Sequence, residues 1–275
     1  MAVALLLLNL TVVVSAIFYI ERAIKNALKP LPSDGALLKK DWKKDIVYLY
    51  QFPRPHYVPN ASPFALKVET YLKSHKIPYE VIESYKLRSA HGLIPFIEFN
   101  GKHIADSRLI LKHLSAHFNE IELTKSPDNA LEETFIARFV DDTVLMSANA
   151  ERVQDKVFDA VGEMIKGVLP QVFKYPLGLA FRSFAKEKFI ENGFGRHTIK
   201  EQSKLLNTDL EAINVFLESR GRHEARKLSI AECTIFGHLA PSYFLPRPLK
   251  IQKTINTQFP LIRDFMQSVM SDYYN

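Results

Sequence analysis

The chain is poor in cysteine, and this scarcity excludes several classes of protein. Cys233 is the single cysteine among 275 residues. The chain therefore forms no internal disulfide framework, no Cys-x-x-Cys redox pair and no thiolate-rich metal cage, and a reducing compartment suits it. Position 233 falls in an apolar helical stretch, where a free cysteine usually acts as a small, unreactive hydrophobic side chain.

An excess of charge of one sign is also missing from most of the chain. The net charge is +6, but residues 21–44 hold seven Lys or Arg against three acidic residues, and residues 1–20 hold no charged side chain. Residues 45–275 therefore keep a net charge of only +2. Because nucleic-acid binding needs a concentrated basic surface, we expect no nucleic-acid partner.

The uncharged residues 1–20 read MAVALLLLNLTVVVSAIFYI. This length allows a helix to cross the hydrocarbon core of a bilayer, which is about 30 Å thick. The basic residues 21–44 follow it, so the positive-inside rule places residues 21–275 in the cytosol, and we expect a single-pass membrane anchor. A cleaved secretory signal is the alternative, because Val14-Ser15-Ala16 has the small residues of a peptidase site. A secretory signal begins with basic residues, which this segment lacks, and the apolar run continues to Ile20; both features favour the anchor.

Glycine is scarce as well, at 10 residues, while 47% of the chain is apolar. This composition is typical of a packed, helix-rich globular protein. Prolines and Gly35 mark residues 21–44 as an exposed basic linker. We expect the globular part to consist of two domains, residues 45–119 and residues 126–275.

Residues 45–119 alternate strand and helix patterns. Ser62 before Pro63 predicts a helix start, since Ser is a favoured N-cap and Pro fits the first helical position. Asp106-Ser107 predicts a second start. With a further helix after residue 83, the expected order is β-α-β-α-β-β-α. The predicted strands are β-branched and aromatic runs at 45–52, 79–83, 96–99 and 102–105, the last two joined by an Asn-Gly hairpin turn.

Residues 126–275 show helical periodicity and no strand runs, which predicts an all-α domain. Ser229 and Glu232 fit the S-x-x-E capping box, a structural helix start. The clearest predicted helices span 134–142, 152–168, 197–217 and 229–239. His113 and His117, in the preceding domain, have the spacing of two metal ligands on one helix face. No third ligand is evident nearby, so we interpret them as solvated histidines and expect no metal.

These features together resemble the glutathione-transferase superfamily. The stretches QFPRPHYVPNASPFALKVETYL, GFGRHT and TIFGHLA followed by PLK are similar to its metaxin and failed-axon-connections group, which includes the cadmium-responsive membrane proteins of nematodes. The similarity covers residues 45–270. It implies the fold class α/β plus all-α, with a thioredoxin-like N-terminal domain followed by a helical transferase-type domain.

The resemblance also implies a glutathione site. Ser62 matches the first residue of the family's S/C-P-F motif, which faces the glutathione sulfur and is therefore the predicted catalytic residue. A hydroxyl donor at the positive end of a helix dipole stabilises a thiolate. Ile94 and Pro95 match the pair at the family's cis-proline, and Asp106 and Ser107 match the acidic-Ser pair that holds the γ-glutamyl group. The alternative is that Ser62 and Asp106 only cap helices.

The chain departs from the family pattern in two places. Position 65 is Ala, and Ser62 replaces the nucleophilic thiol of the thiol-transferase classes, so we expect no disulfide exchange. The connection PRPHYVPNA before Ser62 is longer than usual and stiffened by three prolines. It either lies across the pocket or supplies Arg54, His56 or Tyr57 to a ligand.

Two functions follow from the resemblance. The first is a membrane-anchored glutathione-transferase-like protein that binds glutathione or a similar small thiol peptide in the response to stress, heavy metals or xenobiotics. The lysosome and the mitochondrial outer membrane are candidate locations. The second is a non-catalytic adaptor on a membrane surface, of the metaxin and failed-axon-connections type, with protein partners or a second copy of itself, in transport or axonal development. A solvent-open cleft beside Ser62 favours the first.

Overall fold

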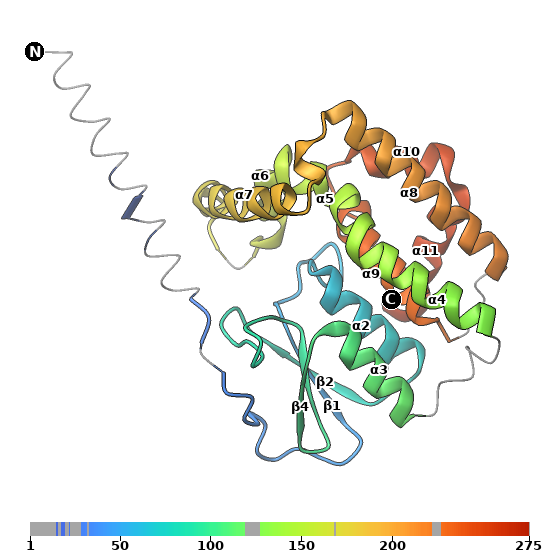
Figure 1. Ribbon diagram of the computed structural model, residues 1–275. Coiled ribbons are helices and arrows are strands. Elements are labelled where there is room, and N and C mark those ends of the chain that lie inside the picture. The colour runs from blue at the N-terminus through green and yellow to red at the C-terminus, as the bar shows by residue number, and fades with distance from the viewer. Residues whose placement is uncertain are drawn as a thin grey trace, which may run out of the picture.

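The computed structural model describes residues 29–31, 33–118, 127–167, 169–221 and 227–274, together with residues 15, 18, 19 and 22. A four-stranded sheet with two helices on one face is followed by a helical domain (Figure 1). The predicted anchor, residues 1–20, lies almost entirely outside the described residues. Within these ranges, no helix has the length and apolar character needed to span a bilayer.

The sheet has the strand order β2-β1-β3-β4 and is mixed. β1 runs parallel to β2 and antiparallel to β3, which pairs antiparallel with β4. All residues of the central strand β1 are buried, as expected for a strand covered on both faces. The four strand predictions are therefore confirmed. The strands are β1 (Val47–Gln51), β2 (Tyr79–Glu83), β3 (Phe96–Phe99) and β4 (Lys102–Ala105).

The two predicted helix starts of this domain are also confirmed. Helix α2 (Pro63–Ser74) has Ser62 as its N-cap, and helix α3 (Ser107–His117) has Asp106. The Asp106 carboxylate accepts hydrogen bonds from the backbone N–H groups of Arg108 and Leu109 at 2.8 and 3.2 Å. Both caps satisfy amide groups that a helix leaves free at its first turn.

The helix predicted between β2 and β3 is wrong. Residues 84–95 form bends and turns, so the order is β-α-β-β-β-α. Hydroxyl groups hold this segment in its turns: Ser84 accepts from the N–H groups of Lys86 and Leu87 at 3.1 and 3.0 Å, and Ser89 accepts from Leu93 N–H at 3.3 Å. Side-chain bonds of this kind compete with helix formation.

The basic linker is attached to the sheet at residues 38 and 39. The buried Glu98 carboxylate of β3 accepts hydrogen bonds from the N–H groups of Leu38 and Lys39 at 2.6 and 2.8 Å, and from the Tyr50 hydroxyl at 2.8 Å. The side chain of Leu38 is exposed, as predicted for the linker, but the backbone of this part is bound to the sheet. The linker also contacts the turns at 84–95, because Leu31 N–H donates to the Lys86 carbonyl at 3.0 Å.

Residues 127–274 contain helices and no strand among the described positions, which confirms the all-α prediction. The single helix predicted at 152–168 is wrong, because the chain breaks at Asp155 and Lys156. Helix α7 was not predicted, since it has no single apolar stripe. The helices are α4 (Pro127–Phe139), α5 (Leu145–Gln154), α6 (Val157–Met164), α7 (Lys174–Glu191), α8 (Ile199–Arg220), α9 (Ile230–Tyr243), α10 (Lys250–Gln258) and α11 (Pro260–Tyr274), with a π-helix at Val140–Val144.

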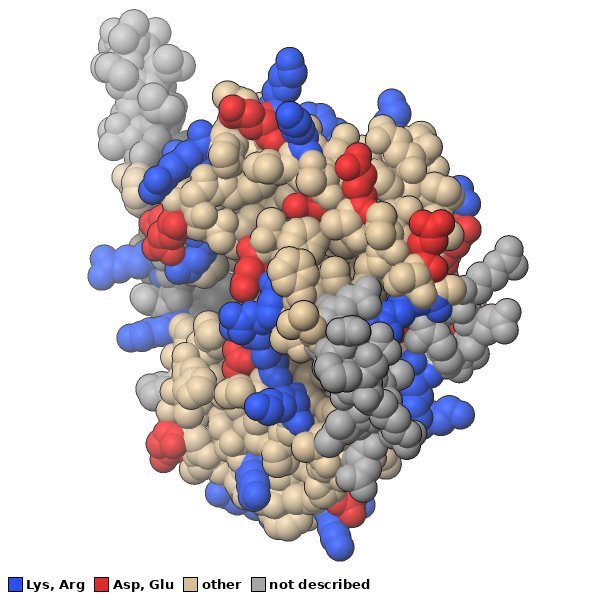
Figure 2. Space-filling model, turned by 45° about the vertical axis from the view of Figure 1, so that its right-hand side comes forward, with Lys and Arg blue, Asp and Glu red and all other residues tan. Residues whose placement is uncertain are grey.

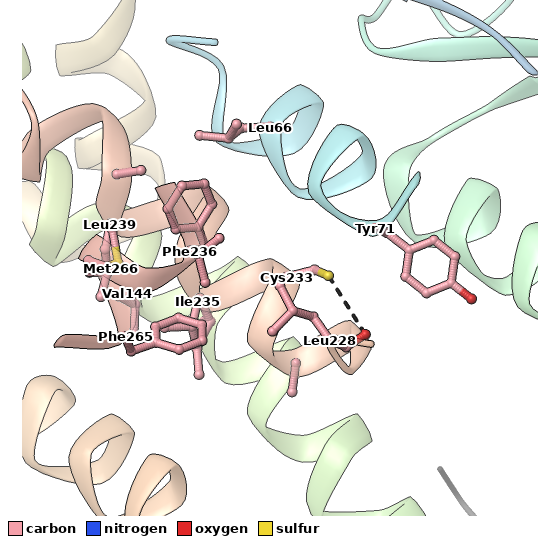
Figure 3. Close-up of a cluster of buried hydrophobic side chains, with 14 of the residues drawn as sticks. Leu66, Tyr71, Val144, Leu228, Cys233, Ile235, Phe236, Leu239, Phe265 and Met266 are labelled. Carbon is pink, nitrogen blue, oxygen red and sulfur yellow. Dashed lines mark hydrogen bonds between the residues drawn. The ribbon is translucent and has the colours of Figure 1, made fainter. Parts of the chain in front are cut away.

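Helix α9 joins the two domains by packing along α2. Figure 3 shows Leu66 and Tyr71 of α2 near Cys233 and Phe236 of α9. Gly237 permits the close approach: a Cβ atom there would lie 2.7 Å from the Pro63 carbonyl oxygen. The predicted capping box of Ser229 and Glu232 is present at the start of α9, and Cys233 is fully buried.

The surface carries charges of both signs. On the face in Figure 2, Lys and Arg side chains are interspersed with Asp and Glu. Surface ion pairs contribute to this mixing, such as Arg247 with Asp159 at 2.9 Å. This pattern agrees with the low net charge of residues 45–275.

Candidate functional site

The start of α2 is fixed by the residues around Ser62. The Ser62 hydroxyl accepts a hydrogen bond from Ala65 N–H at 3.4 Å. The fully buried Asn60 accepts from Ser62 N–H at 2.8 Å and donates to the Phe52 carbonyl at 3.0 Å. Asn60 thus holds the beginning of α2 near the end of β1. No sequence pattern revealed this role of Asn60, although Asn is a frequent residue in turns of this kind.

A partly open cavity of about 400 Å³ lies beside Ser62, between the two domains. Its volume and mostly apolar walls are typical of small-molecule sites. The N-terminal domain contributes Phe52, Pro53, Pro55, Ala61, Ser62, Pro63, Phe64 and Tyr85; the helical domain contributes Leu145, Met146, Asn149, Arg152 and Val153 of α5, Met164 of α6, and Phe181, Phe184, Ala185, Lys188 and Phe189 of α7. The proline-rich connection therefore forms one wall and leaves the space beside Ser62 unfilled.

Two side chains of that connection are held by other parts of the protein. Arg54 forms an ion pair with the buried Glu69 of α2, and donates to the Pro59 carbonyl at 3.1 Å. His56 Nε2 lies 2.6 Å from a carboxylate oxygen of Glu163 on α6. Of the three candidates for ligand contact, Arg54 and His56 are thus engaged within the protein. Tyr57 differs, because its buried hydroxyl lies beside Arg152 of the helical domain and not beside a carboxylate.

Arg152 of α5 is a site residue that the sequence did not reveal. It lines the cavity, although its side chain is almost fully buried, with 6% of its surface exposed. One guanidinium nitrogen donates to the Ala61 carbonyl at 3.4 Å, and Nε has no partner within the described ranges. Burial lowers the pKa of Arg152, and its neighbour Tyr57 opposes this shift. An arginine in a polar helical segment is usually exposed, so no local signal marks it.

The other four predicted site residues gather at the same edge of the sheet as Ser62 but do not line the cavity. The register pairs Tyr50 with Phe96 and Phe96 with Ala105. The end of β1, the start of β3 and the end of β4 therefore lie side by side. This places Ile94, Pro95, Asp106 and Ser107 at this edge, with a cis peptide bond between Ile94 and Pro95.

Two of those four residues, Asp106 and Ser107, serve the structure of the chain itself. The Asp106 carboxylate caps α3, and Ser107 is buried at 5% exposure. Burial lowers the pKa of Lys67, and the charges of Asp141 and, at longer range, Asp106 oppose this shift. The cavity and this edge are thus two neighbouring features, and Ser62 connects them.

A buried charged cluster lies one helical turn beyond Ser62. Lys67 Nζ donates to both carboxylate oxygens of Asp141 at 2.7 Å. His238 of α9 donates from Nδ1 to the Thr234 carbonyl at 2.9 Å, and its Nε2 lies 3.3 Å from Asp141. Burial and the charge of Lys67 lower the pKa of His238 to about 3. These contacts connect α2, the π-helix and α9. Separating the three elements would leave Lys67 or Asp141 buried without its partner, which is costly.

The two histidines with metal-ligand spacing serve another role. His113 and His117 both pack edge-on against Phe99, with ring centroids 6.0 and 4.8 Å away, and His117 Nε2 lies 3.2 Å from Asp45. Across the described ranges, no group of three or more His, Cys, Asp or Glu side chains is placed to hold a metal ion.

The fold and the site define a class of protein. The family described as glutathione S-transferase N-terminal domain matches residues 63–169, which begin at the helix capped by Ser62. The sheet with α2 and α3 and the helical second domain agree with this match, so the chain carries a glutathione S-transferase N-terminal domain over residues 63–169 and has a transferase-like fold.

The chain is also similar to Failed axon connections of Drosophila melanogaster. The two are 46% identical over 83 residues, which cover 30% of this chain and 20% of that protein. The isoprene-epoxide glutathione S-transferase of a Rhodococcus species is 22% identical over 231 residues, covering 78% of this chain and 94% of that protein.

Solved structures agree on the fold. A glutathione S-transferase of Ceriporiopsis subvermispora, in complex with glutathione, has a TM-score of 0.55 at 16% identity. The alignment covers 83% of this chain and 98% of that one.

Proposed function

We propose that the protein binds glutathione, or a similar small thiol peptide, with the thiol at Ser62 and an apolar second substrate in the adjoining cavity. The observation that carries this proposal is the partly open cavity of about 400 Å³ beside the hydroxyl that caps α2. The helix start offers amide groups and a positive dipole end to a thiolate. The glutathione bound to a structural neighbour supports the choice of ligand.

Calorimetric titration of the full chain with glutathione tests this proposal. We expect saturable binding, and S62A should lower the rate of conjugation to a small electrophile about tenfold or more while changing affinity little, because the hydroxyl acts on the developing thiolate. Ser62→Thr is the matched control, since it keeps both the hydroxyl and the N-cap. The absence of binding heat would contradict the proposal. An unchanged conjugation rate in S62A would show that Ser62 takes no part in the mechanism.

We also propose that residues 1–20 anchor the protein in a membrane, with the globular part in the cytosol and a role in the response to stress or heavy metals. The uncharged segment and the basic residues after it support the anchor. Carbonate extraction of membranes should leave the full chain in the pellet and release a chain lacking residues 1–20. Release of both chains would contradict the anchor.

A non-catalytic adaptor is the second candidate. Ile94, Pro95, Asp106 and Ser107 lie outside the cavity, which favours this alternative. Helix α7 also exposes large apolar side chains, including Leu179 and Ile190 at 48% and 44%, and exposed apolar patches often mark interaction sites. If this function is correct, calorimetric titration with glutathione shows no binding heat. L179E and I190E should then abolish chemical cross-linking of the protein to a partner or to a second copy of itself.

A further inference from the structure

The cavity beside Ser62 contains one cation that the protein does not neutralise. Arg152 lines the cavity with only 6% of its surface exposed, and no Asp or Glu of the described residues forms an ion pair with it. Its guanidinium donates a long hydrogen bond of 3.4 Å to the Ala61 carbonyl and lies beside the uncharged Tyr57 hydroxyl, and its Nε has no partner among the described residues. Burying an ionised group without a counter-charge costs several kcal/mol or more.

Three other cationic side chains near the cavity are each paired with a carboxylate. Lys67, which is also buried, is held by both oxygens of Asp141 at 2.7 Å. Arg54 is paired with the buried Glu69. Lys188, also on the cavity wall, is paired with Glu191 at 2.8 Å. Arg152 is therefore the exception among these four cations.

The surroundings of Arg152 show what could neutralise it. The described residues that line the cavity include no Asp or Glu, and most of them are aliphatic or aromatic. Phe181 and Phe184 of α7 form part of the apolar wall. A ligand that completes this site needs an anionic group at the guanidinium and an apolar body against these side chains. The planar fork of arginine matches a carboxylate in particular, through two parallel N–H···O bonds.

We propose that this cavity binds an apolar molecule carrying one carboxylate group, with the carboxylate at Arg152 and the apolar part against α7. The volume of about 400 Å³ suits a compact aromatic or aliphatic acid. The inference deepens the proposed function by naming the chemical class of the second ligand in the same cavity. Its test uses no glutathione, so either proposal can fail without the other.

The experiment compares two probes that differ in charge alone. The full chain is placed in nanodiscs of uncharged lipid and titrated calorimetrically with 2-naphthylacetate and with its uncharged amide, with empty nanodiscs as the blank. We expect the acid to bind at least about tenfold more tightly than the amide, because a charge-assisted bond in an apolar site discriminates by about this factor or more. Equal affinities for the acid and the amide would overturn the proposal, and this comparison needs no variant.

Variants then assign the discrimination to Arg152. In R152M, acid affinity should fall about tenfold or more to the level of the amide, with amide binding unchanged. R152K should keep part of the preference, since it retains the charge without the fork. R182M is the matched control, because Arg182 is an exposed arginine of α7 outside this cavity. Retention of the full acid preference in R152M, with R182M as wild type, would overturn the role of Arg152.

Discussion

Asn60 shows how one buried side chain sets the position of the candidate site. Its amide connects the Phe52 carbonyl to the Ser62 N–H. Asn60→Ala removes both bonds and leaves two partly buried backbone groups without these partners. We expect the free energy of unfolding to fall by about 2 kcal/mol, as measured by urea denaturation. Ser62 should also become less well placed, so glutathione binding should weaken in parallel.

Asn192 offers a matched control for this substitution, because it is an exposed asparagine at the end of α7. Asn192→Ala should change the free energy of unfolding by less than about 0.5 kcal/mol. A denaturation midpoint for Asn60→Ala equal to that of the wild type would show that Asn60 does not hold the start of α2.

His238 makes stability depend on pH. Its pKa is about 3 in the folded protein, because burial and Lys67 disfavour the imidazolium form, and about 6.5 when the chain is unfolded. Below pH 6.5 the unfolded state binds a proton that the folded state does not, so stability falls with pH. Between pH 7 and pH 5, the wild type should lose about 2 kcal/mol more than His238→Asn, in urea unfolding at both pH values.

The difference between wild type and variant isolates His238, because the other titrating groups are common to both proteins. Equal losses of stability in the two proteins would show that His238 is protonated in the folded state and that Asp141, 3.3 Å away, pairs with it.

At the scale of elements, the contact between α2 and α9 positions the site. Gly237 lies where α9 approaches α2, and a Cβ atom there would lie 2.7 Å from the Pro63 carbonyl oxygen and 2.9 Å from the Lys67 nitrogen. These are backbone atoms that cannot move alone. G237A should therefore displace α2, lower the free energy of unfolding by about 1–3 kcal/mol or more, and weaken ligand binding. Thermal unfolding and calorimetry measure the two effects.

Gly162 provides a control within a helix of the same domain. A Cβ atom there would meet the ends of flexible side chains, Gln171 Oε1 at 3.1 Å and Lys174 Cδ at 3.3 Å. G162A should be close to neutral or slightly stabilising, because alanine favours helices by about 1 kcal/mol over glycine. A similar response of both variants would indicate that helix propensity, and not the close approach, governs position 237.

At the scale of the whole molecule, Glu98 attaches the segment that follows the predicted anchor. Its carboxylate accepts three hydrogen bonds, two of them from the backbone of Leu38 and Lys39. Glu98→Ala should release this segment. Trypsin should then cleave after Lys39 or Lys40 about tenfold faster, since a loss of about 1.4 kcal/mol of local stability raises the open population tenfold.

Glu187 of α7 is exposed and serves as the control for this cleavage assay. Glu187→Ala should leave the rate at Lys39 and Lys40 unchanged. An equal rate in Glu98→Ala and the wild type would show that the segment opens independently of the sheet.

The sequence by itself determined the elements whose signals are local. Ser62, Asp106 and Ser229 each cap a helix through hydrogen bonds to residues two or three positions away, and the strand runs carry their own alternation and turn residues. Such interactions depend on a few neighbouring residues, so they can be recognised before the fold is known.

The tertiary structure alone decided what depends on distant contacts. Arg152 lies 91 positions from Ala61 and Lys67 lies 74 from Asp141. The cavity, its unpaired arginine and the buried charged cluster exist because packing brings these segments together. No pattern of neighbouring residues encodes burial or pairing across such separations, since both depend on the arrangement of the whole chain.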